Sequence, residues 1–193
     1  MKTTIYLVRH GEVYNPEGII YGRLPGYGLS QKGQAQVEAA AGALADLAPF
    51  DVLYSSPLQR AQESAALVSA RLSMPVQVDD RLAETDIGGY QGHPFADLPS
   101  PYMTETGVSG IESAASMRTR LMAWAQEATG VHRRIIAVSH RDPIAVALLA
   151  WQDLGLETLT QMALPTATVQ EITLEEGRAE VVCRWPLVDG AAG

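Results

Sequence analysis

Two histidines in this chain follow apolar runs that are typical of buried strands. His10 comes after a run that begins at Thr3, and His140 comes after a run that begins at Ile135. Arg60 lies about one helical turn beyond Ser55-Ser56-Pro57, where another short strand, residues 51–54, stops. In an open α/β sheet, ligands bind at the carboxyl ends of the strands, so we expect these three side chains to lie on the same side of the sheet.

The types of these residues favour an oxyanion as the ligand. Arg9 and Arg60 offer planar cationic groups that bind oxyanions through paired hydrogen bonds. A predicted helix that starts near Pro57 adds free backbone N–H groups, which favours a phosphate dianion over a carboxylate. The sequence contains no Gly-x-x-x-x-Gly-Lys loop, so a nucleotide triphosphatase of the P-loop kind is excluded.

A metal ion is the rival ligand for a pair of histidines. Two arginines beside them would repel a dication, and neither histidine has a second ligand residue close by in the sequence. Cys183 is the only cysteine of the chain. The chain can therefore form neither an intrachain disulfide nor a cysteine-based zinc site, and a reducing compartment is the simpler interpretation.

The composition of the 193-residue chain limits its partners. Its 22 acidic residues outnumber its 14 lysines and arginines, which gives a formal net charge of −8. Such a chain has no basic surface to attract a nucleic-acid backbone or an anionic membrane. The longest apolar run, residues 144–151, is far shorter than the ~20 residues needed to cross a bilayer. We therefore expect a cytoplasmic protein in which residues 1–193 form a single domain.

The apolar pattern predicts strands that alternate with helices. The predicted strands are residues 3–8, 51–54, 76–78 and 135–138, followed by a hairpin of residues 168–174 and 179–185. This order predicts an α/β fold, a three-layer α/β/α sandwich with a mostly parallel central sheet and an antiparallel edge. Two copies of the chain could pair at that edge, so a homodimer stays open.

Polar residues mark the predicted helix starts. Ser30 caps a helix that runs to about residue 47, and Ser113 starts one that ends near residue 130. Ser56 and Asp142 are each followed by proline, a pattern that predicts a cap and then the first helical residue. Residues 82–112 contain many glycines and prolines and no lysine or arginine, and they are predicted to form a loop.

Four short motifs surround the candidate residues. They are Val8-Arg9-His10-Gly11-Glu12, Ser55-Ser56-Pro57-Leu58-Gln59-Arg60-Ala61-Gln62-Glu63-Ser64, Leu82-Ala83-Glu84 with Gly88-Gly89-Tyr90-Gln91-Gly92, and Val138-Ser139-His140. In this order they resemble the histidine phosphatase superfamily, in its phosphoglycerate-mutase-like branch. The resemblance covers residues 3–149. It includes Gly110, Glu112, Ser113 and Arg120, which look like the family's Gly-x-Glu-Ser helix start.

The resemblance implies a reaction in which His10 attacks phosphorus and becomes a phosphohistidine. It implies that Glu84 protonates the leaving alkoxide and then deprotonates the water that hydrolyses the intermediate. Arg9, Arg60 and His140 would surround the phosphoryl oxygens. The chemistry suits these residue types, since a neutral imidazole is a good nucleophile near pH 7 and an uncharged acid is needed to expel an alkoxide. No metal or organic cofactor is then needed.

The chain departs from the family's pattern in three places. Asn15 follows His10 one residue earlier than the pattern has it, so its contact with phosphate requires the loop to absorb a deletion. Arg141 and Asp142 replace the usual glycine pair, and Arg141 could add a charge at the pocket mouth or point to solvent. Gly28 stands where the family often has an acidic residue.

The resemblance implies a phosphomonoesterase for a small, weakly charged organic monophosphate, and two other functions stay open. A phosphoglycerate-mutase-type phosphotransferase would pass the group to a second hydroxyl, but residues 82–117 offer no lysine or arginine for a carboxylate or a second phosphate. A non-catalytic phosphate-binding relative would need the arginines but not Glu84. The candidate substrate-binding residues are Gly11, Asn15, Arg23 and Arg141.

Overall fold

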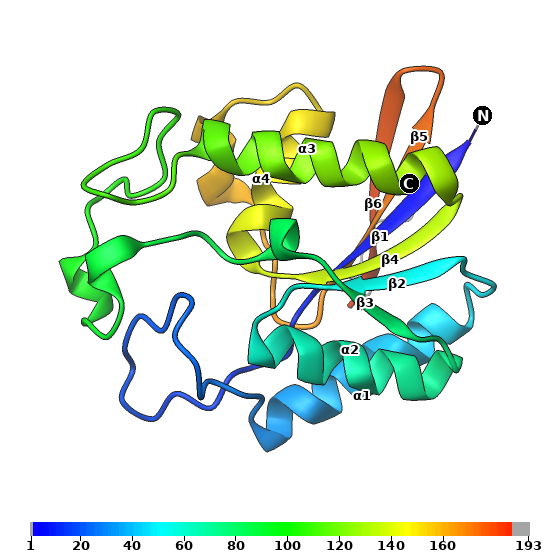
Figure 1. Cartoon of the computed structure of the whole chain (residues 1–193), viewed down its shortest axis with the longest axis horizontal. Helices are drawn as coiled ribbons and strands as arrows, with labels where there is room; N and C mark the ends of the chain where they lie inside the picture. Colours follow the sequence, from blue (N-terminus) through cyan, green and yellow to red (C-terminus); the bar gives the residue numbers. More distant parts are fainter. Residues whose placement is uncertain (1, 187–193) are drawn as a thin grey trace.

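The core of the protein is a six-stranded sheet in the order β3-β2-β4-β1-β5-β6 (Figure 1), seen in a computed structural model that describes residues 2–186. The strands are β1 (Thr3–Arg9), β2 (Val52–Ser55), β3 (Val76–Val78), β4 (Arg134–Ser139), β5 (Val169–Glu175) and β6 (Arg178–Trp185). The first four strands are parallel, whereas β5 and β6 form an antiparallel hairpin at one edge. The predicted sheet is confirmed.

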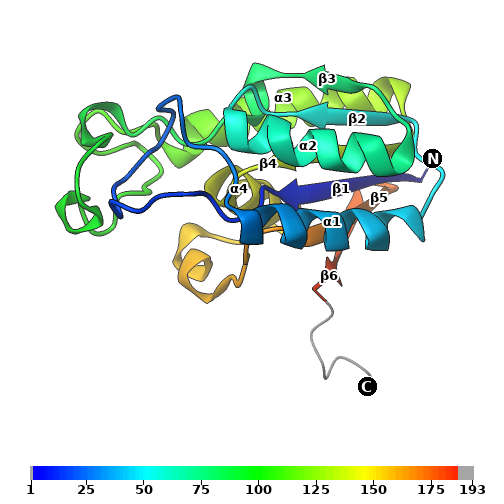
Figure 2. The same ribbon diagram turned by 90° about the horizontal axis from the view of Figure 1, so that it is seen from below.

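Four helices cover the two faces of this sheet (Figure 2). They are α1 (Gln31–Ala45), α2 (Gln59–Leu72), α3 (Ala114–Val131) and α4 (Arg141–Trp151). Buried side chains of α1 and α2 form one apolar cluster with the sheet, and those of α3 and α4 form another on the opposite face. These layers confirm the predicted α/β/α sandwich. Among residues 2–186, no helix combines the length and apolar character needed to span a bilayer.

Strand β1 shows why its apolar run folds as a central strand. Its side chains point alternately to the two faces, so Ile5 and Leu7 pack toward α3 and α4, and Tyr6 and Val8 pack toward α1 and α2. All four side chains are buried. A strand with both faces covered is mostly apolar along its length, and its apolar run ends where the chain leaves the core.

Two of the four helix starts agree with the predicted caps. Ser30 Oγ accepts a hydrogen bond from the Gly33 backbone N–H at 2.9 Å, and Ser113 Oγ accepts one from Ser116 N–H at 3.0 Å. Both residues are the N-caps of their helices, α1 and α3. The serine hydroxyls satisfy backbone donors that the first helical turn leaves unpaired.

The other two predicted caps are wrong. Helix α2 begins at Gln59 with Leu58 as its N-cap, because the chain at Leu58 is still extended. Ser56 Oγ lies 2.7 Å from His140 Nε2 instead of capping the helix. Helix α4 begins one residue before Asp142, with His140 as its N-cap. The Asp142 carboxylate instead accepts hydrogen bonds from Thr85 and Tyr102 of the neighbouring loop.

Two long loops lie side by side beyond the carboxyl ends of the strands, at the left of Figures 1 and 2. Residues 13–30 meet residues 83–113 through a β-bridge between Ile19 and Pro94 and a small apolar cluster of Ile20, Ile87 and Ile111. The second loop contains only short 3-10 turns, as its glycines and prolines predicted. A further 3-10 helix, Leu156–Gln161, follows α4 and was not predicted from the sequence.

Candidate active site

The two histidines of the predicted site come from neighbouring parallel strands. In the register of β1 with β4, Arg9 lies opposite Ser139, so the residues that follow, His10 and His140, leave the sheet at the same place. Their ring centroids are 5.0 Å apart. His10 is 2% exposed and His140 is 0% exposed, so both imidazoles are buried.

The hydrogen bonds of His10 define which nitrogen can react. Its Nδ1 lies 2.7 Å from the Gly11 carbonyl oxygen, which can only accept, so the proton is assigned to Nδ1. Nε2 is then left with a lone pair, toward which Arg60 Nε donates at 3.3 Å. Burial and the Arg60 charge lower the pKa of His10 well below its usual value. His10 is therefore a neutral imidazole with Nε2 available as a nucleophile.

Arg60 is held in place from several sides. It is buried in the first turn of α2, and its Nη2 donates to the Gly22 carbonyl at 2.8 Å. The Tyr21 ring lies under the guanidinium, 4.7 Å from Cζ to the ring centroid. Burial lowers the pKa of Arg60, but a guanidinium stays charged in proteins, so the site keeps a fixed cation beside His10.

Arg9 and His140 each carry a buried polar atom that has no hydrogen-bond partner among residues 2–186. Arg9 Nη1 donates to the Leu164 carbonyl, while Arg9 Nε is buried with no hydrogen-bond partner among residues 2–186. His140 Nδ1 is likewise buried and has no partner among the described residues, although its Nε2 contacts Ser56 Oγ. Burial, followed by the Arg60 charge, lowers the pKa of His140 well below its usual value. These groups suit an anionic ligand that would pair with them.

Glu84 comes from the loop that follows the 3-10 turn Asp80–Leu82, and it lines the pocket next to Arg9. One of its carboxylate oxygens accepts the Thr85 backbone N–H at 2.9 Å. Burial, and then the charge of Asp142, raise the pKa of Glu84 to about 7, against the opposing charges of Arg60 and Arg9. Glu84 can therefore carry a proton near neutral pH, as a general acid must.

Asp142 is the site residue whose place differs most from its predicted one. Its Oδ2 accepts hydrogen bonds from Tyr102 Oη at 2.8 Å and from Thr85 Oγ1 at 3.1 Å, and its Oδ1 accepts one from Arg141 at 2.9 Å. The carboxylate is 10% exposed. It therefore places a negative charge next to the loop that carries Glu84, at a position where the family usually has glycine.

The pocket that Arg9 and Glu84 line has one polar and one apolar wall. Its volume is about 180 Å³. The polar wall includes Arg9, Glu84, Thr85, Arg141 and Asp142, and the apolar wall includes Ile20, Ile87, Phe95, Leu98 and Tyr102. A larger, shallower hollow of about 610 Å³ lies between α3, α4 and the β5–β6 hairpin, and none of the predicted site residues lines it.

A family model for the histidine phosphatase superfamily, branch 1, matches residues 5–185, which is nearly the whole chain. The protein belongs to this superfamily. The structure agrees, because the native structure of mycobacterial glucosyl-3-phosphoglycerate phosphatase superposes with a TM-score of 0.83 at 24% identity, covering 95% of this chain and 98% of that one. At that identity the likeness shows the shared fold.

Two relatives by sequence come from a bacterium, Mycobacterium tuberculosis, and from Thermoplasma acidophilum. An uncharacterised protein of Mycobacterium tuberculosis is 38% identical over 155 residues, which is 74% of this chain and 75% of the relative. A 2,3-bisphosphoglycerate-dependent phosphoglycerate mutase of Thermoplasma acidophilum is 30% identical over 187 residues, 92% of this chain and 90% of the relative. The family thus includes both phosphatases and mutases.

Gly11 and Arg141, two of the four candidate substrate-binding residues, lie at the site with different contacts. Gly11 donates its N–H to Ser64 Oγ at 3.2 Å, so that group is already used. A Cβ on Gly11 would lie 2.3 Å from the Gly33 carbonyl oxygen, which means that glycine is needed for the loop to pack on α1. Arg141 lines the pocket at its mouth and is paired with Asp142.

The other two candidates are Asn15 and Arg23. Their side chains form hydrogen bonds and ion pairs with residues of the protein's own loops. Asn15 Nδ2 donates to the Ile19 carbonyl at 2.9 Å, and its Oδ1 accepts the Ile19 N–H at 3.3 Å, so the amide closes its own loop. Arg23 lies beside Glu112 and Asp86 and donates to the Glu84 carbonyl. The structure brings His10, Arg9, Arg60, His140 and Glu84 together, and it places these two residues outside that group.

The structure also adds residues that the sequence analysis did not assign to the site. Ser56 contacts His140, and Tyr102 and Thr85 hold Asp142. Ser56 lies in the same sequence motif as Arg60, and this motif could have indicated that Ser56 is near the site. Tyr102 and Asp142 are 40 positions apart in the sequence, and no local pattern connects them.

Proposed function

We propose that this protein is a phosphomonoesterase that hydrolyses a small organic monophosphate through a phosphohistidine on His10. The observation that carries the proposal is that His10 and Glu84 both lie near the Arg60 charge. The His10 Nδ1 proton is held by the Gly11 carbonyl, so Nε2 keeps the lone pair that faces Arg60, and burial raises the pKa of Glu84 to about 7. A nucleophile and a proton donor are thus both ready in the resting protein.

The first step transfers the phosphoryl group to the enzyme. The phosphate oxygens accept hydrogen bonds from Arg9, Arg60 and His140, which stabilise the charge of the transferring group. His10 Nε2 forms a bond to phosphorus while the ester P–O bond breaks, and Glu84 gives its proton to the departing alkoxide oxygen. The hydrogen bond from His10 Nδ1 to the Gly11 carbonyl supports the positive charge that develops on the ring.

The second step returns the enzyme to its starting state. The Glu84 carboxylate, now ionised, takes a proton from water, and the oxygen of that water bonds to phosphorus. The N–P bond to His10 breaks, and its electron pair returns to Nε2. One phosphomonoester and one water thus give one alcohol and one inorganic phosphate, and Glu84 is protonated again for the next cycle.

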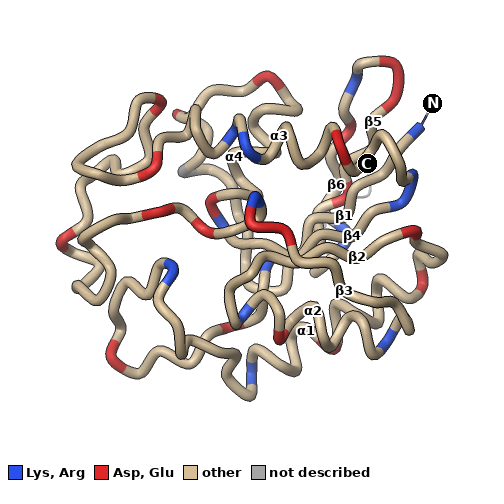
Figure 3. Tube along the Cα trace, in the orientation of Figure 1, with Lys and Arg blue, Asp and Glu red and all other residues tan. Residues whose placement is uncertain are grey.

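The pocket walls support an apolar or weakly charged alcohol as the leaving group. The apolar wall offers no charged partner, and Arg141 is already paired with Asp142. Residues 82–117 carry acidic side chains and no lysine or arginine (Figure 3). A substrate with a carboxylate or a second phosphate would lack a cationic partner there and would meet like charges. This favours hydrolysis of monophosphates over the mutase reaction of the Thermoplasma relative.

The test is phosphate release from a panel of monoesters in the presence of a metal chelator. We expect hydrolysis of p-nitrophenyl phosphate and of apolar alkyl phosphates, with kcat/KM at least about tenfold higher than for 3-phosphoglycerate, since each unpaired carboxylate costs 1–2 kcal/mol or more. Loss of activity in chelator would contradict the metal-free mechanism. Interconversion of phosphoglycerates that outpaces phosphate release would favour the mutase.

Asp142 gives the proposal a pH signature. Replacing Asp142 by asparagine removes a negative charge near Glu84, so the pKa of Glu84 should fall. Glu84 is an acid only while protonated, so its contribution is present below its pKa and is lost as the pH rises through it. We expect the alkaline limb of the kcat/KM profile to move to lower pH, by roughly half a unit to one unit. An alkaline limb that stays in place or moves upward would contradict this role.

A further inference from the structure

The proposed proton donor, Glu84, lies in a segment with no helix or strand. Residues 83–87 follow a short 3-10 turn and precede another. A general acid must sit within a few tenths of an ångström of its reacting atom, and a displacement of about 1 Å can cost about 100-fold in rate. Contacts from outside the segment therefore have to fix its backbone.

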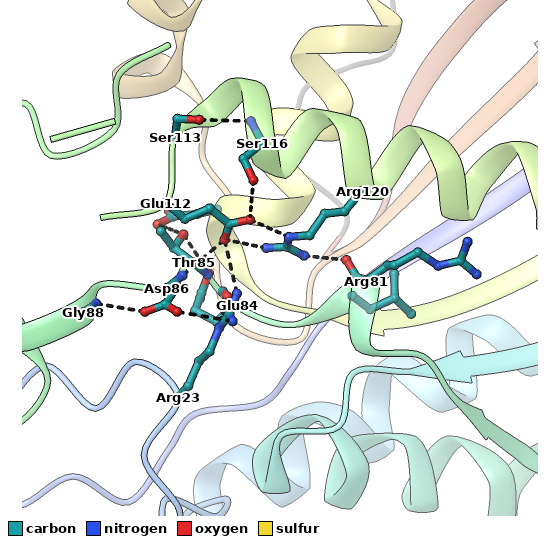
Figure 4. Close-up of polar contacts among 12 residues, drawn as sticks. Arg23, Arg81, Glu84, Thr85, Asp86, Gly88, Glu112, Ser113, Ser116 and Arg120 are labelled. Atoms are coloured by element: carbon teal, nitrogen blue, oxygen red, sulfur yellow. Dashed lines mark hydrogen bonds and ion pairs between the residues drawn. The ribbon is translucent and has the colours of Figure 1, made fainter. Parts of the chain in front are cut away.

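Glu112, just before α3, is the centre of these contacts (Figure 4). Both of its carboxylate oxygens accept from Arg120, with Nε···Oε1 at 2.7 Å and Nη2···Oε2 at 3.0 Å. Oε2 also accepts from Arg23 Nη2 at 3.2 Å and from the Asp86 backbone N–H at 3.2 Å. The Glu112 N–H donates to the Asp86 carbonyl at 2.7 Å. Glu112 thus holds both backbone groups of the residue two positions after Glu84.

The two arginines extend this hold to the rest of the segment. Arg23 Nε donates to the Glu84 carbonyl at 2.7 Å, so its guanidinium bridges Glu112 and the backbone of the proton donor. Arg120 Nη1 donates to the Arg81 carbonyl in the 3-10 turn that precedes the segment. The carbonyls of residues 81, 84 and 86 therefore all accept hydrogen bonds from one connected group of side chain and backbone donors (Figure 4).

Glu112 and Arg120 are largely buried, so each needs the opposite charge of the other as a partner. The side chain of Glu112 is 10% exposed and that of Arg120 is 17% exposed. Burial by itself raises the pKa of Glu112, but the hydrogen bonds and charge of Arg120, with smaller contributions from Asp86 N–H and Arg23, hold it below its ordinary value. Glu112 is thus ionised at neutral pH, which lets it orient two cationic side chains at once.

We propose that Glu112 is a positioning residue for proton donation: together with Arg23 and Arg120 it fixes the segment that carries Glu84, without touching the substrate. This inference rests on the proposed function. It predicts a particular kind of damage to kcat/KM, because a displaced acid slows transfer of the phosphoryl group to His10 only for substrates whose leaving group needs a proton. An alkoxide needs one, whereas p-nitrophenolate is stable enough to leave without it.

The test compares Glu112→Gln with Glu171→Gln. Glu171 is a matched control because it forms a two-pronged pair with Arg184 at 2.9 and 2.8 Å in the β5–β6 hairpin, away from the pocket. We expect Glu112→Gln to lower kcat/KM for an alkyl phosphate by about ten- to a hundredfold, and for p-nitrophenyl phosphate by less than about threefold. Glu171→Gln should stay within about twofold of the parent on both substrates.

A second variant, Arg23→Lys, covers the case in which Glu112→Gln does not fold. It keeps the charge at a side chain that is one-third exposed and loses the donor to the Glu84 carbonyl, so we expect the same selective loss. Equal losses on both esters, or none on the alkyl ester, would overturn the positioning role. If the parent protein hydrolyses neither ester, the proposed function itself fails. Parent activity with no selective loss removes only this inference.

Discussion

Replacing His10 by alanine is expected to lower kcat/KM for phosphomonoester hydrolysis by more than about 10⁴-fold, the order of loss seen when a covalent nucleophile is removed. His10 Nε2 lies 3.3 Å from Arg60 Nε, whereas His140, the other imidazole of the site, has its Nε2 in contact with Ser56. The arginines would still bind phosphate, so the variant should lose turnover and keep phosphate-dependent thermal stabilisation.

His132→Ala is the matched control for this experiment. His132 ends α3 and packs against the Tyr54 ring, away from the pocket. Its replacement removes an imidazole of the same size, and we expect the activity to stay within about twofold of the parent. Activity retained by His10→Ala at more than about a hundredth of the parent's value would contradict the covalent mechanism.

Replacing Glu84 by glutamine has the second-largest expected effect. The amide keeps the shape of the side chain but cannot donate a proton to an alkoxide, so we expect kcat/KM for alkyl phosphates to fall by about 10²- to 10⁴-fold. The loss for p-nitrophenyl phosphate should be much smaller in kcat/KM, since its leaving group needs little protonation. The alkaline limb near pH 7 that follows from the pKa of Glu84 should disappear as well.

The same variant should also change which step limits turnover. Without the carboxylate to activate water, the phosphohistidine should form from p-nitrophenyl phosphate and then persist. Rapid mixing should show a burst of p-nitrophenol that approaches one equivalent per enzyme, followed by slow release. A Glu84→Gln variant that hydrolyses alkyl phosphates at the parental rate would assign the acid to another residue, with Asp86 two positions away as the nearest carboxylate in sequence.

The sequence was sufficient to predict the sheet and the meeting of His10, Arg60 and His140. Strands buried on both faces are mostly apolar along their length, so their ends are visible as the point where polar residues begin. Parallel strands deliver those ends to one edge of the sheet, and this places the two imidazoles 5.0 Å apart. The roles of these residues in catalysis stay predictions until they are measured.

The contacts around Glu84 could not be predicted in the same way. The Asp142-Pro143 pair has the pattern of a helix cap, but the Asp142 carboxylate binds Thr85 and Tyr102, which are 57 and 40 positions away. Such contacts depend on how two irregular loops pack, and irregular loops have no hydrophobic period to read. For the same reason the sequence could not predict that Arg23, a candidate substrate-binding residue, pairs with Glu112.

The most direct test of the account is the detection of phosphate on His10. The Glu84→Gln variant would be mixed with p-nitrophenyl phosphate in chelator, quenched in alkali to preserve an N–P bond, digested and analysed by mass spectrometry. We predict a single phosphorylated peptide that contains His10, and none in a His10→Ala, Glu84→Gln double variant. Phosphate on another residue, or p-nitrophenol released by the Glu84→Gln variant without any phosphorylated His10, would contradict the phosphohistidine mechanism.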